Sequence, residues 1–187
     1  YSGSAAKSPT ANARYSTASD TVTITAGQTS ATYTVTLIDD STYEGTQTGI
    51  FTMSSPSGAT LGANSAYTLS ITDDETAPSI SISDTTVNEN AGTASLTVSL
   101  SNSSASSVTV DWASANGTAT APADYTSASG ALTFTSGQTS KTVTITINDD
   151  ALNEADETLT VGLSNATNAT IADNSGIITI TDNDPIP

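Results

Sequence analysis

The sequence predicts an all-β protein built from tandem immunoglobulin-like antiparallel β-sandwiches. About a third of the 187 residues are Ser or Thr, and many alternate with Val, Ile, Leu or Tyr. This two-residue period is typical of strands with one buried face. Long runs of helix-forming residues are missing, and the chain repeats itself once. These observations together favour two sandwich modules over one large domain.

The repeat is visible in an alignment without gaps. Residues 15–40, YSTASDTVTITAGQTSATYTVTLIDD, lie on residues 125–150, YTSASGALTFTSGQTSKTVTITINDD. Residues 58–75 also match residues 168–184, and this segment is one residue longer in the first copy. A proline follows the acidic end of the first copy at Pro78, which marks a linker. We therefore predict modules at 1–75 and 76–187.

The second copy contains a complete set of strand patterns. Ile80 and Ile82 share one face of the first strand, and Val108, Val110 and Trp112 share one face of the third. Seven short strands with polar turns predict a two-sheet sandwich. The predicted strands span 79–83, 94–100, 108–112, 131–135, 141–147, 158–163 and 177–181.

The first copy lacks its N-terminal strands, because Tyr1 aligns with about Asp111 or Trp112. Counterparts of the strands at 79–83 and 94–100 are therefore missing. Three interpretations are open: the sequence begins inside a module, a neighbouring chain supplies the strands, or the first copy folds differently. The close match between the copies argues against the third. The second would make self-assembly through strand complementation a property of the protein.

Charge and composition exclude several function classes. Three basic and nineteen acidic residues give a net charge of −16, which would repel nucleic acids and anionic membranes. No apolar run approaches membrane-spanning length. The chain has neither His nor Cys, so Ser-His-Asp and Cys-His catalysis are impossible. A carboxylate pair such as Glu154 and Glu157 could serve a glycosidase, but one Trp and two Phe offer little for stacking sugars. We predict that the protein is not an enzyme.

Residues 149–157, DDALNEADE, hold five carboxylates between two strands. Two carboxylates about 4 Å apart repel by roughly 4 kcal/mol at an effective dielectric near 20. The only basic residue of the second module is Lys141, so protein groups cannot neutralise this charge. Oxygen ligands without His or Cys favour calcium. A solvated acidic loop is the alternative. The first copy repeats the pattern, and both copies end their last strand in acids, DDE at 73–75 and DND at 182–184.

The motifs DYTSASGALTF, INDDALNEADETLTV and ITITDND, with VNENAG upstream, resemble the Calx-β domain, a calcium-binding sandwich. The resemblance covers almost all of the second module and the later two thirds of a module in the first copy. It implies bound Ca²⁺ and a set of ligands in the second module. These are Glu89, Asp124, Asp149, Asp150, Glu154, Glu157, Asp182, Asp184 and the main-chain carbonyl of Leu152. Asn183 replaces a common third Asp of the family.

The first copy departs from this pattern. Arg14 stands where Asp124 does, Gln47 stands where Glu157 does, and the counterpart of Glu89 is missing. Arg14 could pair with Asp39 or Asp40, so we predict more or tighter calcium in the second module. The remaining acids could still hold one ion. They are Asp39, Asp40, Glu44, Asp73 and Asp74.

The predicted function is a calcium-binding structural repeat of a large secreted, extracellular or cell-surface protein, such as an adhesin, matrix or filament protein. Its partners would be calcium ions and neighbouring modules of the same protein, with no nucleic acid and no membrane insertion. The alternative is a calcium sensor that couples ion binding to reorientation of the domains. The lack of cysteine does not by itself fix the compartment. Among the contexts that the resemblance implies, a surface protein fits the Ser/Thr-rich, cysteine-free composition better than an exchanger's regulatory loop, by analogy.

Overall fold

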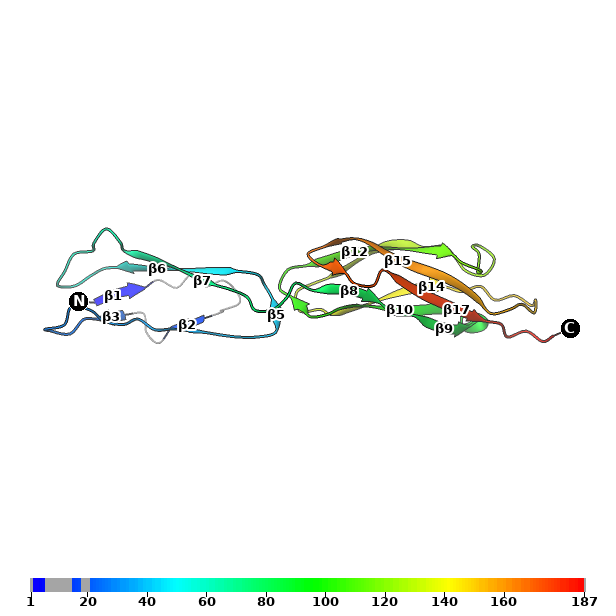
Figure 1. The fold of residues 1–187 in the computed structure, drawn as a ribbon, viewed down its shortest axis with the longest axis horizontal. Coiled ribbons are helices and arrows are strands. Elements are labelled where there is room, and N and C mark those ends of the chain that lie inside the picture. The colour runs from blue at the N-terminus through cyan, green and yellow to red at the C-terminus, as the bar shows by residue number, and fades with distance from the viewer. Residues whose placement is uncertain (1, 6–14, 18–20, 187) are drawn as a thin grey trace. The chain divides into compact units, whose positions relative to one another are not determined.

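The computed structural model describes residues 2–5, 15–17 and 21–186, which form two compact units (Figure 1). Tyr1–Ser41 and Gly45–Asp74 form the first unit, and Thr42–Glu44 and Glu75–Pro187 form the second. Both units are built from strands. Within the described ranges, no helix has the length and apolar character needed to cross a membrane.

The second unit is a sandwich of two sheets, as the sequence predicts. One sheet has the order β13-β12-β15-β17-β9 and the other β14-β10-β8-β16. All seven predicted strands form, with ends shifted by a few residues. The strands of these sheets are β8 (Ser79–Ile82), β9 (Thr85–Asn88), β10 (Thr93–Leu100), β12 (Val108–Asn116), β13 (Ser129–Phe134), β14 (Ser140–Thr146), β15 (Glu157–Thr167), β16 (Thr170–Ile171) and β17 (Ser175–Thr181). A separate parallel pair joins β5 (Thr42–Tyr43) to β11 (Ser103–Ser104).

The first strand of this unit divides between the two sheets, which the sequence pattern did not indicate. β8 pairs with β10, whereas β9 crosses over and runs parallel to β17. Asp84 lies at the crossing, where its Oδ1 accepts a hydrogen bond of 2.8 Å from the N–H of Ile177. Alternation shows which face of a strand is buried but not which strand lies beside it. The sandwich is therefore mainly antiparallel, with parallel pairings at β9 and β16.

The core of the second unit lies between the two sheets. The predicted inward residues Ile80, Ile82, Val108 and Val110 are all buried, and Trp112 is partly buried against them. The other main core residues are Leu96, Val98, Tyr125, Phe134, Val143, Ile145, Leu159, Val161 and Ile178. Glu89 is the one charged residue among the described positions that is buried with this core.

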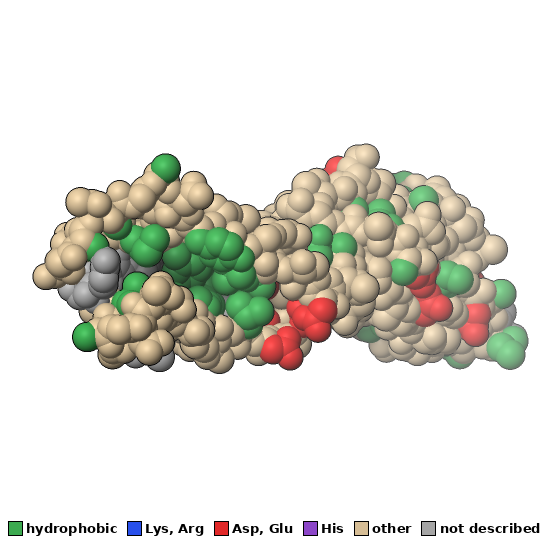
Figure 2. Space-filling model, turned by 60° about the vertical axis from the view of Figure 1, so that its left-hand side comes forward, with side chains coloured by type: hydrophobic (Ala, Val, Ile, Leu, Met, Phe, Trp, Pro, Cys, Tyr) green, Lys and Arg blue, Asp and Glu red, His purple; other side chains and the backbone are tan. Residues whose placement is uncertain are grey.

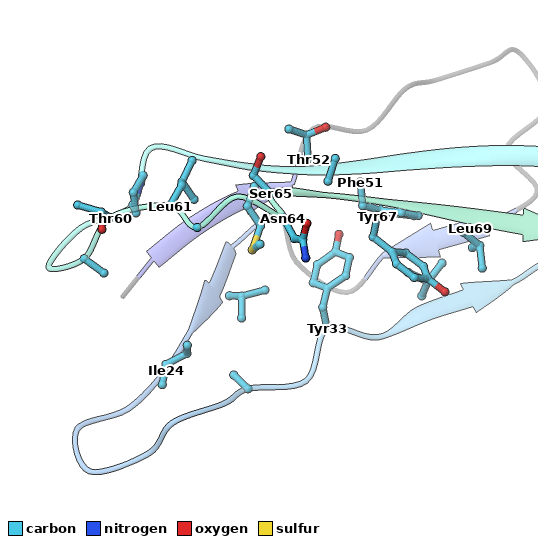
Figure 3. Close-up of a pocket in the computed structure, with 18 of the residues that line it drawn as sticks. Ile24, Tyr33, Phe51, Thr52, Thr60, Leu61, Asn64, Ser65, Tyr67 and Leu69 are labelled. Carbon is cyan, nitrogen blue, oxygen red and sulfur yellow. The ribbon is translucent and has the colours of Figure 1, made fainter.

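The first unit repeats only one of these sheets. Its order β3-β1-β6-β7 corresponds to β13-β12-β15-β17, and a two-stranded pair joins β2 to β4. Among the described residues of the first unit, no strand corresponds to β8 or β10. Hydrophobic side chains gather on the face left open (Figure 2). The first unit contains an apolar cavity of about 810 Å³, with Tyr33, Phe51 and Tyr67 among its lining (Figure 3). The strands are β1 (Ser2–Ala5), β2 (Tyr15–Thr17), β3 (Thr21–Thr23), β4 (Val35–Leu37), β6 (Gln47–Ser54) and β7 (Ala66–Ile71).

Candidate metal centre

Strand pairing brings Glu89 beside the exit of the last strand of the second unit. β9 runs parallel to β17 with Asn88 beside Thr181, so the residues that follow, Glu89 and Asp182, leave the sheet together. Glu89 begins a short 3-10 helix, η1 (Glu89–Ala91), whose N-cap Asn88 accepts from the N–H of Asn90. Only 7% of the surface of Glu89 is exposed. A buried carboxylate thus lies at the point where the chain leaves the sandwich.

The acidic loop after β14 reaches the same end of the sandwich. β10 and β14 are antiparallel with Thr93 opposite Thr146, and the N–H of Ile147 donates to the carbonyl of Gly92. The acidic loop, which starts with Asp149 and Asp150, therefore begins next to η1. At the other end of this loop, β15 begins at Glu157, opposite Ile180 of β17. The two acid groups that the sequence predicts to meet do so, because both flank adjacent strand ends.

Glu89, Asp150 and Asp184 form the first carboxylate group. Each offers one oxygen, and the three oxygens lie within 4.8 Å of one another. The N–H of Asp150 donates to Oε1 of Glu89 at 3.3 Å, which holds the loop against η1. One oxygen of Asp184, Oδ2, is buried and has no hydrogen-bond partner in the described part of the chain. A buried oxygen without a partner is costly, and a cation at this group would satisfy it.

Asp124, Glu154 and Glu157 form the second group, again with three oxygens within 4.8 Å of one another. Asp124 is fixed by Thr120, whose N–H donates to Oδ2 of Asp124 at 2.6 Å. The N–H of Asp124 donates in return to the carbonyl of Thr120 at 3.0 Å. Asp124 is thus held in place before any ion binds, while Glu154 is exposed on the loop.

The electrostatics of both groups favour a proton or a cation. Burial raises the pKa of Glu89 above its ordinary value, against the opposing hydrogen bond from Asp150, and the charges of Asp150 and Asp184 raise it further. Burial likewise raises the pKa of Glu157, and repulsion from Asp124 adds to this. The pKa of Glu154 and of Asp184 is raised in the same way. Each raised pKa means that the ionised form of the carboxyl group is destabilised by its surroundings.

No basic side chain among the described residues of the second unit relieves this repulsion. Lys141, the only Lys or Arg after residue 75, pairs with Val98 near the far end of β14. It stands five residues before Thr146, roughly 17 Å away along the strand. Six carboxylates in two groups, without His or Cys, form a donor set of hard oxygens that suits calcium.

Three further predicted ligands lie around these groups. Besides burial and nearer acids, the charge of Asp149 raises the pKa of both Glu89 and Asp184. Asp182 accepts from Asn153 through Oδ2 at 2.7 Å and from the N–H of Asp184 through Oδ1 at 3.2 Å. The N–H of Leu152 donates to Oδ1 of Asp150 at 2.7 Å, and its side chain is exposed.

Two residues that no sequence pattern singled out position these acids. Asn153 Nδ2 donates to Asp182 and, at 3.0 Å, to the carbonyl of Asp184, which ties the acidic loop to the exit of the last strand. Thr120 holds Asp124 through its main-chain N–H, which donates to Oδ2 of Asp124. Asn153 lies inside the acidic segment 149–157, but its partners stand about thirty residues away in the sequence. Only the fold brings them together.

Fewer of the predicted ligands lie together in the first unit. Asp39 and Asp74 each offer an oxygen, and these lie within 4.8 Å of each other. Asp73 instead accepts from the N–H of Gly45 through Oδ2 at 2.7 Å. Among the described residues, neither Asp40 nor Glu44 joins a group of this kind. Arg14, which could pair with an acid of this unit, lies outside the described residues.

Comparison with known proteins decides the family. The Calx-beta domain model matches residues 3–75 and residues 72–184, which together span nearly the whole chain. The chain belongs to the Calx-beta family. The predicted resemblance is thereby confirmed. Calx-beta domains are calcium-binding modules and not enzymes, and this chain carries two of them in tandem.

Solved structures agree on the fold. The crystal structure of the apo-form Calx CBD1 domain has a TM-score of 0.55 and 23% identity, and the match covers 58% of this chain and 100% of that one. The calcium binding domain CBD12 of CALX1.1 has a TM-score of 0.54 and 25% identity. That match covers 56% of this Calx-beta chain and 46% of the solved one, so less than half of that structure is represented. A search of curated proteins found no match.

Proposed function

We propose that this chain is a calcium-binding structural repeat of a large extracellular or cell-surface protein, in which calcium stiffens the end of a sandwich module. The observation that carries the proposal is the pair of carboxylate groups at one end of the second unit. They link η1, the acidic loop and the exit of β17, three segments far apart in the sequence. An ion shared among them would hold these segments together and offset their repulsion.

Calcium dissociation would therefore loosen this end of the module. Without the ion, only hydrogen bonds such as those from Asn153 join the loop to the exit of the last strand. The expected consequence is faster proteolysis within residues 149–157 when a chelator is present. Limited proteolysis with and without calcium, followed by mass spectrometry of the fragments, measures this. Cleavage at the same rate in both conditions would contradict a stiffening role.

The alternative is a calcium sensor that couples ion binding to reorientation of the domains. The similar structure CBD12 of CALX1.1 is a calcium binding domain, which supports this role as well as the structural one. Affinity separates the two proposals. Saturation at submicromolar calcium favours a cytosolic sensor, whereas dependence in the millimolar range favours an extracellular scaffold. A calcium titration of the full chain by calorimetry gives the answer.

Self-assembly through strand complementation is a second candidate function. The open apolar face of the first unit favours it, because an added strand would cover the face as β8 and β10 do in the second unit. Sedimentation of the chain over a range of concentrations tests it. A strict monomer at every concentration would exclude assembly of this chain with itself.

A further inference from the structure

Asp184 is followed by a proline, and Asp184–Pro185 is the only Asp–Pro bond in the chain. The carboxyl group of an aspartate can reach its own main-chain carbonyl carbon and close a five-membered ring. A proline nitrogen, which carries two carbon substituents besides the carbonyl, is more basic than other peptide nitrogens and leaves more readily. In the first module Glu75 stands in the place of Asp184 and is followed by Thr76, so only the second module ends in this bond.

The fold fixes the peptide unit that contains this bond. The N–H of Asp184 donates to Oδ1 of Asp182 at 3.2 Å. The carbonyl oxygen of Asp184 accepts from Nδ2 of Asn153 at 3.0 Å, and Asn153 also donates to Oδ2 of Asp182 at 2.7 Å. Pro185 is exposed, so solvent reaches the nitrogen that would leave. The bond is thus held against the acidic loop on one side and open to water on the other.

The hydrogen bond from Asn153 lies where negative charge would develop. Attack on a carbonyl carbon converts its oxygen into an oxyanion, and a fixed N–H donor about 3 Å from that oxygen stabilises the transition state. Asn153 Nδ2 is such a donor to the carbonyl of Asp184. The same hydrogen bond polarises the carbonyl group before attack. Asn153 therefore activates the carbonyl that Asp184 would attack.

The attacking oxygen is on Asp184 itself. Its Oδ2 is buried and accepts no hydrogen bond from the described residues, so no donor has to be displaced before it attacks. One oxygen of Asp184 lies within 4.8 Å of carboxylate oxygens of Glu89 and Asp150. Repulsion among the three disfavours the resting carboxylate, whereas bond formation at Oδ2 would remove its charge. Both features favour attack over the resting state.

We propose that Asp184 cleaves its own peptide bond to Pro185. Oδ2 forms a bond to the main-chain carbonyl carbon of Asp184, and the bond from that carbon to the nitrogen of Pro185 breaks. The electron pair of the broken bond stays on the proline nitrogen, which takes a proton from solvent. Water then opens the resulting cyclic anhydride and leaves Asp184 as a terminal residue with two carboxyl groups. Each chain reacts once and consumes one water molecule.

Calcium would control this cleavage, a consequence that rests on the proposed function. An ion held by Glu89, Asp150 and Asp184 would bind an oxygen of Asp184 and restrain its carboxylate. The bond would then be stable in calcium and labile without it. Loss of the ion would release the residues from Pro185 onward from the end of the sandwich.

The experiment follows the intact mass of the full chain during incubation in excess chelator at one fixed pH. The expected product ends at Asp184 and lacks residues 185–187. A peptide of residues 178–187, ITITDNDPIP, carries the same bond without the fold. The folded chain should cleave about tenfold or more faster than the peptide, because only the fold supplies the Asn153 donor. No cleavage of the chain, or a rate no higher than that of the peptide, would overturn the inference.

Three variants test the parts of the site. Pro185→Ala leaves every carboxylate in place and should slow cleavage about tenfold or more, since the leaving nitrogen is less basic. Asn153→Asp keeps the size of the side chain but removes the donor and should also slow cleavage about tenfold or more. Asn183→Asp is the matched control. It adds the same charge next to Asp184, and its oxygen can still accept from the N–H of Asn90, so its rate should not fall. Equal slowing by Asn153→Asp and Asn183→Asp would contradict the role of the Asn153 donor.

The same assay in excess calcium separates the inference from the proposed function. Slower cleavage in calcium supports both the self-cleavage and its control by the ion. Equal cleavage in calcium and in chelator supports self-cleavage and contradicts calcium binding by Asp184. An intact chain in chelator contradicts self-cleavage, whatever calcium does to the stability of the fold.

Discussion

A single carboxylate, Glu157, distinguishes the candidate metal site of the second module from that of the first. It completes the group with Asp124 and Glu154, whereas Gln47 begins the equivalent strand of the first unit. Gln47 pairs with Ile71 as Glu157 pairs with Ile180, so the two positions are structurally equivalent. The sequence alignment thus located a real difference in charge at one place in the fold.

Glu157→Gln should have opposite effects with and without calcium. The loss of one carboxylate should weaken calcium binding by the second unit by about tenfold or more, since affinity depends on the charge of the ligands. In chelator, the same change removes repulsion from Asp124 and Glu154 and should stabilise the fold. Calorimetry measures the first effect and thermal unfolding the second. Asp156→Asn, in the same loop but in neither carboxylate group, is the control and should change binding little.

The raised pKa values predict how stability depends on pH. In the folded, ion-free unit the pKa of Glu89, Glu154 and Glu157 lies above its ordinary value, so the folded state holds protons that the unfolded state has released. The stability from these groups is present below the ordinary carboxyl pKa of about 4 and is lost as pH rises through the raised values. In chelator, acidification from neutral pH towards this window should therefore raise the melting temperature.

With calcium the trend should reverse, because protons compete with the ion for the same oxygens. Fluorescence of Trp112, the only tryptophan, reports unfolding of the second unit in both series. The same trend in calcium and in chelator would show that these carboxylates do not hold the ion.

At the scale of strands, Gly176 lies where the two sheets of the second unit approach each other closely. A Cβ there would lie 2.7 Å from Leu96 Cδ2 and 2.8 Å from the carbonyl oxygen of Ser83, which is backbone and cannot rotate away. Gly176→Ala should destabilise the second unit by about 1–3 kcal/mol. Gly162→Ala is the control, since its added Cβ would meet its nearest atoms at 3.9 and 4.0 Å. Chemical denaturation followed by Trp112 fluorescence measures the free energy of unfolding of both variants. Equal stability of the two variants would contradict this prediction.

The strands themselves were largely predictable from the sequence. Alternation located every long strand of the second unit and the inward side of Ile80 and Val108, because a period of two fixes which face is buried. The crossing at Asp84 was not predictable, since the partner of a strand depends on the whole sheet. Similarly, the acids could be expected to meet, but their division into two groups depends on loop geometry. The parts played by Thr120 and Asn153 depend on it as well.

At the scale of the whole molecule, the two modules are similar in sequence but differ in the number of carboxylates that they bring together. The second unit has two groups of three carboxylates, and the first brings Asp39 and Asp74 together. We therefore expect Asp150→Asn to remove a larger share of the calcium bound by the full chain than Asp39→Asn does. Calorimetric titration of the two variants measures this. Equal losses would show that both modules bind the ion alike.

We propose that calcium holds the acidic end of the second unit together. The most direct test is thermal unfolding of the full chain, followed by Trp112 fluorescence, in excess calcium and in excess chelator. A free calcium concentration one hundred times the dissociation constant should stabilise the fold by about 2.7 kcal/mol per site. The unfolding midpoint should be clearly higher in calcium than in chelator. An unchanged midpoint would contradict it.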